Sequence, residues 1–344
     1  MPTAYLTHPD YIVHDVPGHP ERPDRVRAVW AELKRANLLD KMSAITPQAV
    51  NDEQIGYAHT ADYINLLHHA DNHDYGIRFD ADTLALPETP QIARLSAGGV
   101  LGAVEAVLSG AADNALAVTR PPGHHAIPAR AMGFCFLGNV AIAARHAQRV
   151  HGLKRVLIVD YDVHHGNGTQ DIFYDDDSVL FISTHQYPFY PGTGAINETG
   201  RGRGRGYTLN IPLQAGMGDA EHAAIYQQIV WPAARRFQPE LIIVSAGFDG
   251  HHADFLAMMN MSLHGYAHLT RELIRMADVL CGGKIVFAME GGYNTDVLAH
   301  GVRNIAHALL GEDEISDPFG VTGGREIDIA PLISRLMTLH GLSI

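Results

Sequence analysis

Aspartate and histidine side chains follow the apolar run at residues 155–160 with a spacing that suits a metal ion. Asp162 and His164 are two residues apart, and alternate residues of an extended chain point the same way. Asp249, at the end of a second apolar run over 241–249, supplies a third ligand. Two carboxylate oxygens and one imidazole nitrogen leave the fourth tetrahedral position of a zinc ion open to water, as catalytic sites require. The alternative interpretation is an ordinary polar loop.

Two more polar segments follow apolar runs. The segment Arg-Pro-Pro-Gly-His-His-Ala (120–126) contains His124 and His125, and Glu-Gly-Gly-Tyr-Asn (290–294) contains Tyr293. In open parallel sheets, ligands bind beyond the carboxyl ends of the strands, so all four segments should converge on one crevice. A structural histidine pair usually lies within an apolar face, whereas this pair follows a Pro-Pro-Gly turn. The pattern therefore favours a functional role.

The elements that must position these segments alternate along the chain as apolar runs and helical patterns. Five runs are rich in aliphatic residues, which is typical of strands covered on both faces; they begin at Ala115, Val156, Val179, Leu241 and Ile285. Helical patterns cover 24–37, 91–108, 139–150, 220–236, 263–280 and 295–310. The alternation predicts an α/β fold with a parallel sheet. No Ser/Gly/Pro linker divides residues 1–344, which are expected to form a single catalytic domain.

Composition narrows the function classes. A net charge of −13 with 22 histidines argues against nucleic acid as a partner and leaves room for a cationic substrate. The basic segment Arg201-Gly-Arg-Gly-Arg-Gly206 is interpreted as a surface loop. Two cysteines and no recognisable leader ahead of Tyr5 predict a cytoplasmic location. No apolar stretch is expected to span a membrane.

Six motifs in order give the chain a family resemblance. They are the segments 120–126, Gly-Phe-Cys-Phe-Leu-Gly-Asn (133–139), Asp-Tyr-Asp-Val-His-His-Gly-Asn-Gly (160–168), Pro-Gly-Thr-Gly (191–194), Gly-Phe-Asp (247–249) and 290–294. Together they resemble the metal-dependent histone deacetylase superfamily, nearest to class II deacetylases and bacterial histone deacetylase-like amidohydrolases. The resemblance implies the arginase/deacetylase fold, a three-layer α/β/α sandwich with a mostly parallel sheet of about eight strands.

The resemblance implies one Zn²⁺ per chain on Asp162, His164 and Asp249, with Fe²⁺ or Co²⁺ as substitutes. It also implies that His125 acts first as general base and later as general acid, while His124 stays protonated.

Three further residues complete the implied catalytic set. Asp160 matches the residue that holds His124, and Asn167 matches the partner of His125, where class I enzymes carry aspartate. An amide orients the ring without adding charge, so the pKa of His125 should be raised less than a carboxylate would raise it. Tyr293 matches the donor to the tetrahedral oxyanion.

The implied substrate channel uses five residues. Gly133 matches the carbonyl that accepts the scissile amide N–H, and Phe134 and Tyr190 match the aromatic walls. Leu256 matches a rim position at which polyamine-specific relatives place glutamate, and its apolar side chain favours acyl-lysine. Asp82 matches the rim carboxylate that binds the substrate backbone, although a neighbouring aspartate, Asp80, is equally available.

One or two K⁺ sites are implied as well, and Arg25 matches an arginine on the acetate exit path. The first K⁺ site would use Asp160, Asp162, His164, Ser183 and Thr184. The second would use backbone carbonyls of Phe173, Asp176, Val179 and Tyr207.

Several readings of the function stay open at this point. The main one is a zinc-dependent amidohydrolase that removes acetyl or similar acyl groups from lysine side chains or related amides. The alternatives are a deacetylase of acetylpolyamines or small acylamides and a catalytically silent acyl-binding module. His251 and His252 could suggest a two-manganese arginase centre, but the paired aspartates that bridge such metals are missing after Asp249. The expected partner is the amide substrate, with no nucleic acid and no membrane, and assembly into a homo-oligomer stays open.

Overall fold

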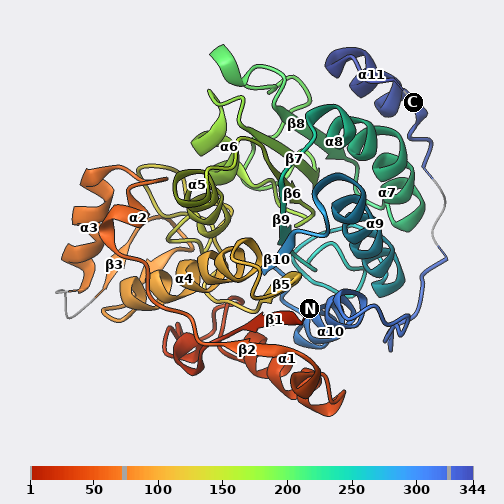
Figure 1. Cartoon of the computed structure of the whole chain (residues 1–344). Coiled ribbons are helices and arrows are strands. Elements are labelled where there is room, and N and C mark those ends of the chain that lie inside the picture. Colours follow the sequence, from red (N-terminus) through yellow and green to blue (C-terminus); the bar gives the residue numbers. More distant parts are fainter. Residues whose placement is uncertain (1, 72–75, 324–326, 344) are drawn as a thin grey trace.

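A single eight-stranded parallel sheet forms the centre of the protein in this computed structural model, which describes residues 2–71, 76–323 and 327–343 (Figure 1). The strand order is β2-β1-β5-β10-β9-β6-β7-β8. The strands are β1 (Thr3–Leu6), β2 (Ser43–Ile45), β5 (Asn114–Ala117), β6 (Val156–Asp160), β7 (Val179–Gln186), β8 (Thr208–Leu213), β9 (Leu241–Ala246) and β10 (Ile285–Met289). The predicted α/β fold with a parallel sheet is confirmed.

Helices cover both faces of the sheet and enclose two apolar cores. Buried side chains of α1, α9 and α10 belong to one core, and those of α5 belong to the other. Helix α4 contributes most of its buried apolar side chains to the second core, while its Ile92 and Leu95 belong to the first. The longer helices are α1 (Asp24–Arg35), α3 (Ala61–Asp71), α4 (Thr89–Leu108), α5 (Asn139–His151), α9 (Leu263–Cys281), α10 (Thr295–Leu309) and α11 (Ala330–His340). Shorter ones are α2 (Asp52–Ile55), α6 (Asn167–Phe173), α7 (Asp219–Ile225) and α8 (Trp231–Phe237).

The central strands are continuously aliphatic because neither of their faces meets water. Every residue of β6, β9 and β10 is buried. Asp160, the last residue of β6, lies opposite Ser245 of β9, which lies opposite Ala288 of β10. The carboxyl ends of these three strands therefore finish at the same level, and the polar segments that follow them start side by side.

One helix differs from its prediction. The pattern over 220–236 predicts a single α-helix, whereas the structure inserts one π-helical turn (Tyr226–Val230) between α7 and α8. The N–H of Trp231 donates to the carbonyl of Tyr226, five residues back. Pro232 has no N–H to donate, so the regular ladder cannot continue through it, and the helix widens instead.

Helix α4 also corrects the expectation that no apolar stretch is long enough to cross a membrane. By length and composition alone Thr89–Leu108 would qualify, with a mean hydropathy of 1.2 over its best window. Of that window, 72% is buried inside the protein. The side chains of Ala97, Val100 and Val104 belong to the core that α4 shares with α5, so packing within the fold accounts for the apolar character of this helix.

Candidate active site

The three predicted metal ligands meet beyond the ends of β6 and β9. His164 Nδ1 lies 3.0 Å from Asp249 Oδ2 and 3.3 Å from Asp162 Oδ1. One ligand atom from each residue lies within 4.8 Å of the other two, and all three residues are buried. Carboxylate and imidazole donors at this separation match the ligand set of a mononuclear Zn²⁺ site.

The loop after β10 leaves room beside these carboxylates only because residue 291 is glycine. A Cβ at Gly291 would lie 2.3 Å from Asp249 Oδ2 and 2.5 Å from Asp162 Oδ2. Burial, together with the charge of Asp162, raises the pKa of Asp249 to about 6. Two buried carboxylates this close are costly without a cation between them. The residues present therefore fit a divalent metal ion.

The histidine pair follows β5 and lies next to this ligand set. His124 Nδ1 is 3.0 Å from Asp160 Oδ2, and its Nε2 is 3.8 Å from Asp162 Oδ1. Burial opposes protonation of His124, but the charges of Asp162 and Asp160 outweigh it and raise the pKa well above the usual range. His124 is therefore held as an imidazolium that balances the buried carboxylates.

His125 has the opposite electrostatic setting. Burial lowers its pKa well below the usual value, and the charge of His124 lowers it further. Its Nδ1 lies 2.8 Å from Asn167 Oδ1, while Asn167 Nδ2 is directed to the carbonyl of His125. An amide oxygen only accepts, so Nδ1 carries the hydrogen and Nε2 keeps its lone pair. His125 is thus a neutral imidazole able to accept a proton.

A pocket of about 240 Å³ leads from the surface to these groups. Its lining residues are Asp82, His125, Gly133, Phe134, His164, Phe189, Tyr190, Leu256 and Tyr293. All five predicted substrate residues are among them. Asp80, the other candidate at the rim, does not line the pocket but accepts the N–H of Gly133 (3.4 Å) and that of Asp82 (2.9 Å).

The backbone at Gly133 and Phe134 is folded tightly against the histidines. Gly133 has φ +57°, and a Cβ there would lie 2.5 Å from Cδ2 of His125. Phe134 also has a positive φ (+68°), an unusual conformation for a bulky residue. Its N–H donates to Thr83 Oγ1, and its ring packs edge-on against His19 at 4.5 Å between centroids. These contacts hold the aromatic wall in place.

Phe189 is a channel residue that the sequence reasoning missed. Its ring stacks on the His164 imidazole with 5.4 Å between centroids and 18° between planes, so it fixes the orientation of a metal ligand. Tyr190, the predicted wall, instead meets His125 edge-on at 5.1 Å. The sequence did contain a signal for Phe189: it is adjacent to Tyr190, directly before the Pro-Gly-Thr-Gly turn, and both aromatic rings can reach the same channel.

Tyr293 is buried at the base of the pocket. Its ring meets Phe134 edge-on at 5.8 Å, and the guanidinium of Arg25 lies 5.0 Å from its centroid. Burial raises the pKa of Tyr293 well above its usual value, so its hydroxyl remains a donor. Arg25 also donates to the carbonyls of Gly292 (2.7 Å) and Glu290, which links α1 to the loop that carries the tyrosine.

Asp254 is a second residue that the sequence reasoning missed. One of its oxygens accepts the N–H groups of both Tyr293 (2.6 Å) and Asn294 (2.8 Å). It lies five positions after Asp249 in a loop with no recognisable pattern, and only the folded chain brings it to the tyrosine. Asp254 therefore holds the backbone that carries Tyr293, in addition to the hydrogen bonds that Arg25 makes to Gly292 and Glu290.

Comparison with known proteins agrees with this geometry. Residues 19–309 match the family described as "Histone deacetylase domain". The chain belongs to the histone deacetylase family. Histone deacetylase 14, chloroplastic, of Arabidopsis thaliana is 41% identical to this deacetylase over 89% of its chain and 76% of the relative.

Two more comparisons concern a solved structure with the same fold and a relative that carries the name of a polyamine deacetylase. The crystal structure of the HDA15 HD domain is 35% identical, with a TM-score of 0.91 over 99% of this deacetylase and 96% of that chain. The polyamine deacetylase HDAC10 of Homo sapiens is 40% identical over 91% of the chain, which spans about half of that relative (48%). The predictions of the family, of its α/β/α fold and of a deacetylase enzyme are confirmed.

The two extra histidines after Asp249 do not join the ligand set of the deacetylase. His251 Nδ1 accepts the N–H of Ala253, and His252 Nε2 lies 3.1 Å from the carbonyl of Gly320. The His251 ring packs edge-on against Phe319 with 5.3 Å between centroids, so both histidines contact the segment 319–320. This placement favours one metal ion over an arginase-like pair.

The residues predicted to bind K⁺ belong to β6, β7, the end of α6 and the segments next to these elements. In the first set, Thr184 Oγ1 donates to the carbonyl of Asp160 at 3.5 Å, and Ser183 Oγ lies 2.9 Å from His185 Nδ1. In the second, the carbonyls of Phe173 and Tyr207 accept backbone N–H groups. Both K⁺ sites stay predictions.

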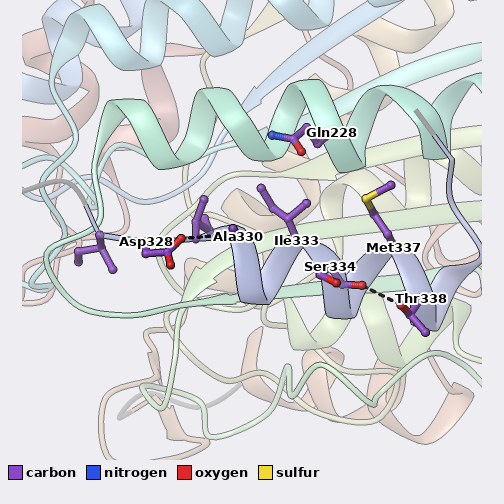
Figure 2. A pocket seen from close by; sticks show the side chains of 9 residues that line it. Gln228, Asp328, Ala330, Ile333, Ser334, Met337 and Thr338 are labelled. Carbon is purple, nitrogen blue, oxygen red and sulfur yellow. Dashed lines mark hydrogen bonds between the residues drawn. The ribbon is translucent and has the colours of Figure 1, made fainter.

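A larger hollow of about 820 Å³ lies between α11 and the π-helical turn and shares no lining residue with the catalytic pocket (Figure 2). Its polar groups serve α11 itself. Asp328 Oδ1 accepts the N–H of Ala330 at 3.0 Å, and Thr338 Oγ1 donates to the carbonyl of Ser334 at 2.9 Å (Figure 2). The smaller pocket holds the catalytic groups, so volume alone does not mark the active site here.

Proposed function

We propose that this deacetylase hydrolyses the side-chain amide of acetylated or similarly acylated lysine. Asp162, His164 and Asp249 would hold one Zn²⁺, for which Fe²⁺ or Co²⁺ could substitute. A divalent ion bound there would supply Lewis acidity to the amide carbonyl and to the attacking water. Support comes above all from the opposite protonation of two adjacent histidines beside this ligand set, because hydrolysis needs one fixed positive charge and one free base.

The protein's own groups move the proton and stabilise charge. Nε2 of His125 accepts a proton from the attacking water and later delivers it to the leaving amine. His124 remains an imidazolium held by Asp160. The hydroxyl of Tyr293 donates to the oxyanion that forms at the former carbonyl.

The channel supports an acyl-lysine substrate. Phe134 and Tyr190 face a narrow space that suits a methylene chain, and Gly133 offers a carbonyl to the scissile N–H. At the rim, Asp82 is placed to bind the substrate backbone, while Leu256 lines the pocket with an apolar side chain. A polycation gains no charge pairing from leucine, so this side of the rim favours lysine amides.

Acetylpolyamines are the second candidate, because a similar human protein carries the name polyamine deacetylase. A panel of acetyl-lysine peptides, acetylpolyamines and simple anilides, assayed with one zinc-loaded preparation, separates the two. We expect the highest kcat/KM for an acetyl-lysine peptide. A higher kcat/KM for an acetylpolyamine would show that polyamines are the better substrates. If no amide were hydrolysed at full metal occupancy, the protein would be a catalytically silent acyl-binding module.

The partner of His125 gives a prediction about pH. Activity requires neutral His125 and is lost as the pH falls through its lowered pKa. Asn167→Asp places a negative charge beside Nδ1, which stabilises the imidazolium and raises that pKa. The acidic limb of the kcat/KM profile should therefore move to higher pH. The control Asn167→Gln adds no charge, and an unchanged or downward-moving limb in Asn167→Asp would contradict the pairing.

A positioning role for Asp254 gives another prediction. Asp254→Ala removes the oxygen that accepts the N–H groups of Tyr293 and Asn294, so the tyrosine should lose its fixed position. We expect kcat to fall by about tenfold to a hundredfold with little change in KM, because small misplacements of a reacting group cost this much. Zinc content should stay at the wild-type value. Asp254→Asn keeps one acceptor and should be intermediate; a pure rise in KM would count against the role.

Residues 1–344 are proposed to act as one catalytic domain in the cytoplasm, without nucleic acid or membrane as a partner. Cys135 and Cys281 are both buried free thiols, which suits a reducing compartment. Assembly into a homo-oligomer stays a prediction that the mass of the protein in solution would test.

A further inference from the structure

A second group of metal-ligating side chains lies between α4 and α5. Glu105 comes from α4, while His146 and His151 come from the last two turns of α5. Glu105 Oε2 lies 2.9 Å from Nε2 of His146 and 2.8 Å from Nε2 of His151. The two imidazole nitrogens and the carboxylate oxygen are all within 4.8 Å of one another. Three donors from two helices therefore point at one spot.

The setting of these side chains separates them from an ordinary surface ion pair. His146 is only 7% exposed, and its Nδ1 has no hydrogen-bond partner among the described residues. Its ring is thus placed by packing, with Nε2 directed at the carboxylate. The Glu105 side chain is 45% exposed, so an ion can reach the group from solvent.

The donor set also matches a known coordination chemistry. Two imidazole nitrogens and one carboxylate oxygen bind Zn²⁺ in tetrahedral sites with a fourth position open to water. Ligand bonds of 2.0–2.1 Å imply donor separations of about 3.4 Å, so Glu105 would need to move back by roughly half an ångström. An exposed glutamate on a helix surface can do so by changing rotamer. Hydrogen bonds from both histidines lower the pKa of Glu105, which keeps the carboxylate ionised.

The group lies far from the catalytic centre. The opposite end of α5 begins at Asn139, whose side chain donates to Ser96 Oγ and to the carbonyl of Pro121, just before the catalytic histidine pair. Seven and twelve helical steps of 1.5 Å place His146 and His151 about 10 Å and about 18 Å from Asn139 along the helix axis. An ion at the far end would join α4 to α5 without touching the substrate channel.

We propose that Glu105, His146 and His151 form a second binding site for a borderline divalent transition ion, with Zn²⁺ as the probe. The ion fastens the carboxyl-terminal ends of α4 and α5 to each other and stabilises the fold. It does not take part in amide hydrolysis.

The test measures bound zinc in the full-length protein after equilibrium dialysis at micromolar free zinc. Wild type should bind two ions per chain, and Glu105→Gln should bind one fewer with unchanged kcat. In Asp249→Ala, zinc should still raise the melting temperature by about 3 °C or more, as expected for a ligand well above its dissociation constant. Adding Glu105→Gln to that variant should abolish the shift.

A second ligand variant and a control variant test whether the lost ion comes from this site. His151→Asn, at the exposed end of α5, should lower the stoichiometry as Glu105→Gln does. His264→Gln removes a histidine that pairs with Asp317 at 2.9 Å, with no third metal-ligating side chain beside them among the described residues, and should change nothing. Equal zinc content in Glu105→Gln, His151→Asn and wild type would overturn the proposal. Each variant is compared with its own parent protein, so the difference in bound zinc does not depend on which metal occupies the catalytic centre.

Discussion

Asp249→Ala is expected to lose tight metal binding at the catalytic centre and amide hydrolysis together. The carboxylate supplies one of three ligands, and His164 would lose the partner that lies 3.0 Å from its Nδ1. Metal ions contribute several kcal/mol to transition-state stabilisation, so activity should fall by about a thousandfold or more. Metal analysis after dialysis and steady-state rates on an acetyl-lysine peptide check both effects.

His252→Ala is the control for this variant, because His252 lies in the same loop but binds the carbonyl of Gly320 instead of the ligand set. It should keep the wild-type metal content and rate. If Asp249→Ala retained the metal at near-normal turnover, the ligand assignment would be wrong. Loss of one ion in His252→Ala would instead support a two-metal centre.

Tyr293→Phe should slow turnover by about a hundredfold or more, since one donor to the oxyanion is lost from a preorganised site. The ring keeps its contacts with Phe134 and Arg25, so the fold and the metal site should not change. KM should change much less than kcat, because the hydroxyl acts mainly on the transition state.

The channel provides the matched control for the tyrosine. Tyr190→Phe also removes a hydroxyl from a residue that lines the pocket, but from the wall position, and we expect its rate to stay within a few-fold of wild type. If the Tyr293 ring only packed against its neighbours, Tyr293→Phe would be tolerated as well as Tyr190→Phe. Equal rates in Tyr293→Phe and wild type would therefore return Tyr293 to a structural role.

The sequence was sufficient to predict those elements whose structure depends on a short, continuous stretch of residues. Strands such as β6 and β9 are buried on both faces and read as uninterrupted aliphatic runs, so their ends could be located, and with them Asp162, His164 and Asp249. The edge strand β2 gave no such signal. Strand β2 has only three residues, Ser43–Ile45, none of them buried, so its pairing depends on β1 and not on its own pattern.

The residues that were missed act across long separations in the chain. Asp254 holds Tyr293 through backbone N–H groups 39 and 40 positions away, and no local pattern encodes that contact. The π-helical turn before Pro232 was also missed, although the proline itself was visible. The proline alone does not say whether the helix ends there or widens into a π-helical turn. That outcome depends on how the helix packs in the folded protein.

The strand order has a consequence for how the protein is made. Strand β10 lies between β5 and β9, so it joins β2-β1-β5 to β9-β6-β7-β8. Until residues 285–289 leave the ribosome, no strand can join β5 to β9, so any sheet that forms earlier has an open edge there. Open edges invite pairing with other chains. The strand that closes the middle of the sheet is thus synthesised last, directly before the tyrosine that completes the active site.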